Sequence, residues 1–303
     1  MRALVSDDVF RDFEAVLAES AGLFPQGRIP SPNTLQRDDE SPVDMTRQKD
    51  IDEVLWEQRY QDLLEGCGSA VERACMLASR EPLGSARMRA IPHPSLGTCL
   101  DDQTVTTAVG LRLHEPVCIP HPCIKCHERL SSHGHHALHC ISSKGRSFRH
   151  SMINREVAMT LNSVLIPTLR EPPGTHLDPF LRPDGISLVP WERGKFLAWD
   201  VTVADTLAPS YQGVTSLRAG AAAAKLEGHK KSKYRDLLPQ YIFIPVGLET
   251  LGPMGPSAKS FFSSLSLRMT EAKRDPRDFD HLLQRVSLII MRSNTMCGIG
   301  TMQ

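Results

Sequence analysis

The sequence predicts an α/β fold (α+β type) in which a mixed β-sheet lies between helices. Two apolar runs are separated by a polar segment that contains a glycine, which is the pattern of a β-hairpin with a longer loop. In chain order, the predicted elements are a helix over 151–165, a short extended segment at 169–171, hairpin strands at 185–190 and 196–204, a helical stretch over 215–237 and a strand over 241–249. This order, α-β-β-β-α-β, favours a sheet covered by helices.

Three parts are expected along the chain. Residues 1–105 form a helical N-terminal region with a flexible linker near 24–48, which is rich in Pro, Ser, Asp, Arg and Gln. Residues 106–145 form a small module around cysteines and histidines, and residues 146–303 contain the mixed sheet. Further helices are predicted over 7–22, 51–65, 70–78, 257–271 and 277–293.

The composition is that of a globular protein without a charge excess. Of the 303 residues, 41% are hydrophobic and 23% are charged, and the formal net charge is zero. A surface that binds nucleic acid must therefore come from local basic clusters. No apolar run has the length of a membrane span, and the charged N-terminus lacks a secretory signal. We therefore expect an intracellular protein, nuclear or cytoplasmic, with no membrane partner.

Eight cysteines are present, and those at 118–140 form a tight group. In a reducing compartment this grouping favours metal binding over disulfides. A Cys-x-x-Cys followed by a His/Cys pair has roughly the spacing of a small structural zinc site. The expected ligands are Cys123, Cys126 and Cys140 with either His135 or His136, and Cys118 lies close enough to replace one of them. The loop between them is too polar to fold alone, so we expect one structural Zn²⁺.

Two acidic residues mark the predicted hairpin. Asp184 directly precedes the first strand, and Asp200 lies inside the second. A turn centred between the strands makes the two residues near-opposite neighbours, about 5 Å apart at Cβ. Two carboxylates at that distance repel each other unless one is protonated or a cation lies between them. Because Mg²⁺ is commonly held by one or two carboxylates, the pair is a candidate magnesium site.

Basic residues gather in two places. Lys144, Arg146 and Arg149 directly follow the cysteine/histidine module, where they are expected to contact nucleic-acid phosphates. The second cluster lies in the helical stretch over 215–237, where Lys230 and Lys233 are three residues apart and share a face. Because this helix crosses the hairpin in the predicted order, one of these lysines can approach the acidic pair.

Three motifs resemble the PD-(D/E)xK pattern of restriction-endonuclease-like enzymes, with the lysine moved to a following helix. They are Arg182-Pro183-Asp184-Gly185, Trp199-Asp200-Val201-Thr202-Val203 and Lys230-x-x-Lys233-Tyr234. The preceding zinc knuckle is similar to the C-terminal region of non-LTR retrotransposon reverse transcriptases that carry a restriction-like endonuclease. Segments such as 109–113 and 249–253 resemble the tails of animal retroelement proteins, and the resemblance covers roughly residues 85–295.

The resemblance implies a restriction-endonuclease-like core with a preceding zinc knuckle, which nicks target DNA during retrotransposition and meets DNA and element RNA. The site residues that it implies are Asp184 and Asp200 for Mg²⁺, Lys230 or Lys233 as the catalytic lysine, Glu171 as a further acid, and His136 as the zinc histidine. Thr202 stands where the family usually has its lysine, and no polymerase aspartates are present. The alternative is a catalytically inactive, zinc-containing remnant that still binds nucleic acid.

Overall fold

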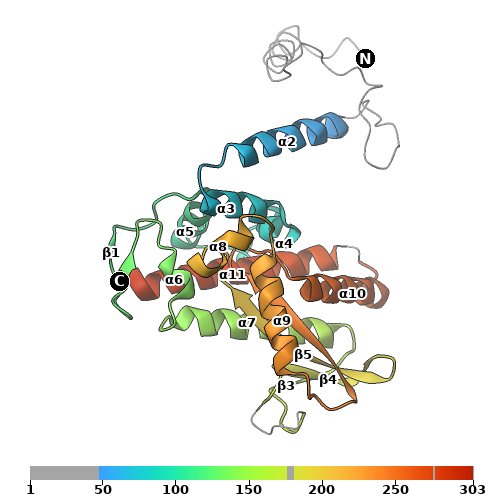
Figure 1. Cartoon of the computed structure of the whole chain (residues 1–303). Helices are drawn as coiled ribbons and strands as arrows, with labels where there is room; N and C mark the ends of the chain where they lie inside the picture. The colour runs from blue at the N-terminus through green and yellow to red at the C-terminus, as the bar shows by residue number, and fades with distance from the viewer. Residues whose placement is uncertain (1–47, 176–180, 276, 303) are drawn as a thin grey trace, which may run out of the picture. The chain divides into compact units, whose positions relative to one another are not determined.

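The computed structural model describes residues 48–175, 181–275 and 277–302 (Figure 1). Contacts divide the chain after Gly66 into two units, which are considered separately. This division differs from the boundaries predicted after residues 105 and 145. The reason is that helices from both sides of those positions pack against the same C-terminal helix within the second unit.

In the first unit the described element is α2 (Gln48–Glu65), which confirms the helix predicted over 51–65. The helix predicted over 7–22 and the linker up to residue 47 lie outside the described residues. The helices of the second unit are α3 (Ala70–Arg80), α4 (Pro82–Ser85), α5 (Asp102–Leu113), α6 (His136–His139), α7 (Lys144–Ser163), α8 (Pro209–Thr215), α9 (Ala221–Lys233), α10 (Pro256–Lys273) and α11 (Asp278–Met302), with 3₁₀ turns η1 (Ala86–Arg89) and η2 (Pro94–Leu96). Among these described helices, none combines the length and apolar character needed to cross a bilayer.

The strands form a mixed sheet and a small separate ribbon. They are β1 (His121–Pro122), β2 (Arg129–Leu130), β3 (Thr168–Arg170), β4 (Gly185–Glu192), β5 (Lys195–Ala204) and β6 (Tyr241–Glu249). The four-stranded sheet has the order β3-β4-β5-β6, in which β5 and β6 run parallel and the other pairs antiparallel. With α7 before β3, and α8 and α9 between β5 and β6, the described order matches the predicted α-β-β-β-α-β (Figure 1). The mixed α/β fold is therefore confirmed.

Two helices differ from their predicted bounds in ways that shape the site. The helix predicted from residue 151 begins at Lys144, so the basic run after the cysteine/histidine module is its first two turns. The helical stretch predicted over 215–237 is broken into α8 and α9 at Gly220, which has a φ of 79°. A Cβ there would overlap the carbonyl of Met254, so the chain turns at a residue that only glycine fits.

The β4–β5 hairpin has the predicted pairing at the acidic end. Arg193 and Gly194 form the turn, both in the left-handed region. Near the turn the register shifts, but Gly185 pairs with Trp199 at the other end. Continuing that register by one residue places Asp184 opposite Asp200, as the sequence predicted.

Trp199 anchors the hairpin to α7. Its ring is fully buried in the main core, and its indole N–H donates to Asn154 Oδ1 at 2.8 Å. The amide of Asn154 in turn donates to the carbonyl oxygen of Asp184 at 3.2 Å. Because side chains alternate along a strand, Trp199 faces the core built with α7, α10 and α11, whereas Asp200 points to the face crossed by α9.

Gly185→Ala should lower the free energy of unfolding by about 1–3 kcal/mol, because the new methyl group would overlap the buried ring of Trp199. Gly228→Ala is the matched control. Gly228 lies within α9 with open space at its Cβ, so alanine there should raise the free energy of unfolding by about 1 kcal/mol. Urea unfolding of both variants measures the difference, and equal effects at the two sites would contradict the described packing.

Candidate metal centres

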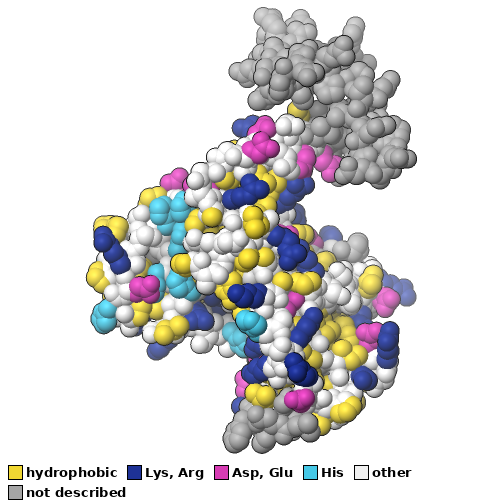
Figure 2. Space-filling model, viewed as in Figure 1, with side chains coloured by type: hydrophobic (Ala, Val, Ile, Leu, Met, Phe, Trp, Pro, Cys, Tyr) yellow, Lys and Arg dark blue, Asp and Glu magenta, His cyan; other side chains and the backbone are white. Residues whose placement is uncertain are grey.

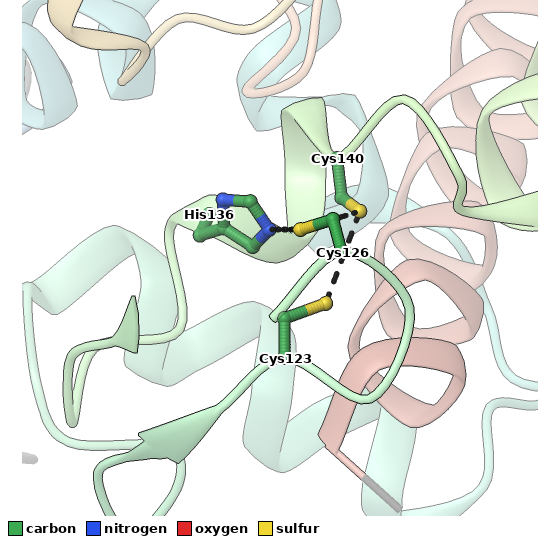
Figure 3. A group of neighbouring side chains, drawn as sticks. All are labelled: Cys123, Cys126, His136 and Cys140. Carbon is green, nitrogen blue, oxygen red and sulfur yellow. Dashed lines mark hydrogen bonds between the residues drawn. The ribbon is translucent and has the colours of Figure 1, made fainter. Parts of the chain in front are cut away.

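Cys123, Cys126, His136 and Cys140 form a tight cluster whose ligand atoms all lie within 4.8 Å of one another (Figure 3). The Sγ of Cys140 lies 3.9 Å from that of Cys123 and 3.8 Å from that of Cys126. His136 Nε2 lies 3.1 Å from Cys126 Sγ. A tetrahedron with Zn–S distances of about 2.3 Å has edges of about 3.8 Å. The cluster can therefore hold a metal ion and is compatible with structural zinc.

Local structure explains how these four side chains meet. Cys123 and Cys126 lie on a tight turn after β1, which closes when the His127 N–H donates to the Cys123 carbonyl at 2.8 Å. The Lys125 N–H points back to Cys123 Sγ at 3.4 Å. Burial raises the pKa of the Cys123 thiol, but the N–H groups of Lys125 and Cys126, together with the Cys126 and Cys140 thiols, hold that pKa below its usual value. His136 and Cys140 lie four residues apart at the start and end of the one-turn helix α6, so they share a face.

The structure selects His136, not His135, as the histidine of this cluster. The ring of His135 turns away and stacks with His114 at a centroid distance of 5.2 Å. Burial lowers the pKa of His135 to about 4. The other ring nitrogen of His136 lies 3.2 Å from a carboxylate oxygen of Glu128, which is the usual partner of a metal-bound imidazole. Cys118 is not part of the cluster, because its thiol donates to the carbonyl oxygens of the β2–α6 connection.

A second cluster contains Asp184 and Asp200, and it adds a residue that the sequence did not predict. His150 of α7 joins the two carboxylates, and the ligand atoms of all three lie within 4.8 Å of one another. His150 Nε2 lies 2.9 Å from Asp184 Oδ2, which also accepts the Val201 N–H at 2.6 Å. The hydrogen bond to Asp184 raises the pKa of His150 above its usual value. No local spacing in the sequence connects His150 to the hairpin, so its place in this cluster could not be predicted from the sequence.

Of the two candidate lysines, Lys230 reaches the acidic pair. Its Nζ lies 2.5 Å from Asp200 Oδ1, and Asp200 is almost fully buried. Lys233 Nζ instead lies 5.0 Å from the ring centre of Tyr234. The Tyr234 hydroxyl donates to Asp200 Oδ2 at 2.7 Å, so one oxygen of this carboxylate accepts a hydrogen bond and the other is ion-paired with Lys230. Burial first, and then Asp200, raise the pKa of Tyr234, which keeps the phenol protonated. Tyr234 is a second site residue whose role the sequence did not predict.

Glu171 is placed differently from the prediction. Its side chain is exposed and is not a member of the acidic cluster. Only its backbone approaches: the Glu171 N–H donates to the Asp184 carbonyl at 3.1 Å, and the residue has a φ of 47°. Glu171 therefore helps to fix the backbone before the hairpin, and the structure does not place its carboxylate with the other two.

Helix α7 turns some basic residues that follow the cysteine/histidine module to the surface and others to the interior. Lys144 and Arg146 are exposed, as a phosphate-contacting surface requires. Arg149 is only 2% exposed, so the expectation that it forms part of this surface is wrong. Its guanidinium donates to Asn294 Oδ1 at 2.8 Å and to the Leu138 carbonyl at 3.2 Å, and thereby links α6, α7 and α11. The helical period places Arg149 on the face of α7 that packs on α11, so its side chain is buried.

Other basic side chains follow α9 on the molecular surface. In Figure 2, Lys and Arg side chains (dark blue) are spread along the course of this helix on the face shown. Lys225, Lys231 and Lys233 are exposed there, and Lys230 is partly buried. The helix that carries Lys230 to the acidic cluster thus also presents exposed positive charge, although the whole chain has no net charge.

No family model matches this chain, and no curated protein matches it. A function is therefore inferred from the chemistry of the two clusters and from the fold that positions them.

Proposed function

We propose that the second unit is a metal-dependent DNA endonuclease of the PD-(D/E)xK type, derived from the tail of a non-LTR retrotransposon protein. The observation that supports this most strongly is the convergence of Asp184, Asp200 and Lys230. The β4–β5 hairpin brings the two aspartates together, and α9 brings Lys230 to the same point at the end of that hairpin. The α-β-β-β-α-β order is the one that the resemblance implies for such a core.

The residues of the acidic cluster fit a bound Mg²⁺. Asp184 and Asp200 offer hard carboxylate oxygens at one place, and two carboxylates so close favour a cation between them. When bound, Mg²⁺ supplies a polarised water and offsets charge on the phosphate. The protein itself orients the two carboxylates. His150 and the Val201 N–H bond to Asp184, and the Tyr234 hydroxyl donates to Asp200.

Lys230 is proposed to contact the scissile phosphate. In the structure its ammonium group is paired with Asp200, and a metal ion on that carboxylate would release it towards an anion nearby. A positive group prepositioned beside a reacting phosphate stabilises the negative charge that builds up during cleavage. Thr202 stands where PD-(D/E)xK motifs usually have their lysine. It lies on β5, two residues after Asp200, and lines a cavity together with Lys230.

The cysteine/histidine cluster is proposed to hold a structural Zn²⁺. The residues Cys123, Cys126, His136 and Cys140 supply three thiolates and one imidazole with no open position, which is the ligand set of a structural site. The module would present the exposed Lys144 and Arg146 to the DNA backbone, where contacts carry little sequence information.

One observation favours the alternative function, an inactive DNA-binding remnant. The ion pair with Lys230 already neutralises the Asp200 carboxylate that a metal ion needs, and Tyr234 donates a hydrogen bond to its other oxygen. A site used only for its fold would have this neutralised form. A nicking assay on supercoiled plasmid separates the two functions. The control is omission of Mg²⁺ instead of addition of EDTA, because a chelator would also remove zinc. Open-circular product that depends on Mg²⁺ or Mn²⁺ supports the endonuclease, and DNA binding without any product supports the remnant.

Lys230→Ala should slow nicking at saturating Mg²⁺ by about a hundredfold to a thousandfold, because a charge aimed at the reacting phosphate is lost. Lys233→Ala is the matched control: it removes the same charge from the same helix, but this lysine is turned to the ring of Tyr234. We expect it to nick within a few-fold of the parent chain. Equal losses in the two variants would show that the lysines act only through general attraction to DNA.

A further inference from the structure

A cavity of about 490 Å³ lies where α7 begins, beside the acidic cluster. It exists because β4 starts at Gly185 and pairs with β5 only as far as Trp199. Beyond that point no strand of the described residues pairs with β5 on the β4 side, and residues 201–203 line the cavity. His150 and Lys230 also line it, so the cavity lies beside the carboxylates that these two residues contact.

The charged side chains of the cavity are all basic. Arg146, Arg149, His150 and Lys230 line it, and among the described residues no Asp or Glu does. His150 and Lys230 are each paired with a carboxylate at its border. Arg149 is buried but has no such carboxylate partner. The acceptors of its guanidinium are neutral, and its buried Nε has no partner within the described residues. The carboxylate of Asp205 acts on Arg149 only at a distance, because its oxygens are bonded to His139 and Thr250. A buried cation with an unpaired N–H is costly, and an anion bound near it lowers that cost.

The N-terminus of α7 provides a second and independent observation. Ser143 is the N-cap residue of this 20-residue helix, yet its side chain makes none of the usual capping bonds. It lines the cavity, is only 4% exposed, and its Oγ is buried without a hydrogen-bond partner. A helix N-terminus with free N–H groups and a positive dipole end is a ready site for a phosphate.

We propose that this cavity binds a phosphate group of a nucleic-acid strand, namely one next to the phosphate that is cleaved. The donors are Ser143 Oγ and the guanidinium of Arg146, while Arg149 supplies buried charge and the positive end of the α7 dipole favours an anion. The volume exceeds that of a small inorganic ion and admits a phosphate with its attached sugar. Assignment of the phosphate to DNA rests on the proposed function, whereas anion binding itself does not.

The first test uses inorganic phosphate on the full chain, at constant ionic strength against chloride and without added Mg²⁺. Phosphate should raise the midpoint of thermal unfolding of the parent chain. Ser143→Ala and Arg146→Ala should each bind phosphate about tenfold more weakly, as expected for loss of a hydrogen bond to a charged group. Ser142→Ala and Arg155→Ala are matched controls, since both residues are exposed, lie close in the chain and do not line the cavity. We expect them to bind like the parent.

Ser143→Ala has an additional readout that excludes a folding defect. In chloride its thermal midpoint should be equal to or above that of the parent chain, because the substitution removes a buried hydroxyl that has no partner. Absence of phosphate-dependent stabilisation in the parent chain overturns the proposal. So does equal phosphate affinity of Ser143→Ala and Ser142→Ala.

The second test assigns the phosphate to DNA. Duplex oligonucleotides carry one neutral methylphosphonate linkage, moved along the strand, and binding is measured without Mg²⁺ so that no cleavage occurs. One linkage should weaken binding of the parent chain about tenfold and should not weaken binding of Arg146→Ala any further. If every linkage weakens binding of Arg146→Ala as much as it weakens binding of the parent chain, the cavity does not hold a DNA phosphate. Phosphate binding without nicking would refute only the endonuclease, and nicking without phosphate binding would refute only the cavity site.

Discussion

Asp200→Asn is expected to reduce nicking by more than about a hundredfold. Removal of groups that merely support a metal ligand costs 10–100-fold in affinity or activity, so removal of a ligand itself should cost more. Asparagine keeps the shape of the side chain and one oxygen for the Tyr234 hydroxyl, so the fold should persist. DNA affinity should remain equal or increase, because Lys230 loses its partner and a negative charge near the phosphates disappears.

The measurement combines a nicking time course with fluorescence anisotropy of labelled duplex at fixed salt. Asp236→Asn is the matched control, because this exposed aspartate lies just after α9 and outside the acidic cluster. It should nick at the parent rate. If Asp200→Asn nicks as fast as this control, the acidic cluster has no part in catalysis. If the parent chain itself never nicks with Mg²⁺ or Mn²⁺ but binds DNA, the remnant is the correct function.

Removal of zinc should unfold residues 118–142 while the four-stranded sheet remains folded. The module buries few apolar side chains of its own: its core is Cys123, Leu130 and Cys140 with Cys126 beside them. Three of these four residues are ligands, so the metal replaces an apolar core. Structural zinc contributes about 10–16 kcal/mol to the folding of small zinc-finger peptides at neutral pH, which is far more than this cluster could gain from burial.

Metal analysis of the purified chain should find about one equivalent of zinc. Hydrogen exchange with and without a chelator should then show lost protection in 118–142 and unchanged protection in β5 and β6. Cys140→Ser should reproduce the chelated state, and Cys99→Ser, an exposed thiol outside the cluster, should not. Zinc below about a tenth of an equivalent would exclude a structural site.

The sequence by itself determined the features that depend on neighbours in the chain. The Cys-x-x-Cys turn and the four-residue spacing of His136 and Cys140 follow from one tight turn and one helical turn. The near-opposite placement of Asp184 and Asp200 follows from a hairpin whose two strands alternate with a period of two. Strand and helix periods operate over a few residues, so these geometries can be read without knowledge of the rest of the fold.

Only the tertiary structure decided between the candidate site residues that the sequence left open. His136 was selected over His135, and Lys230 over Lys233, by the direction in which each helix packs. His150 joined the acidic cluster because α7 begins seven residues earlier than its apolar pattern indicates, which brings its second turn against Asp184. The same shift buried Arg149 against α11. These outcomes depend on contacts between elements far apart in the chain, where one helical turn moves a side chain from solvent to core, and no local pattern carries that information.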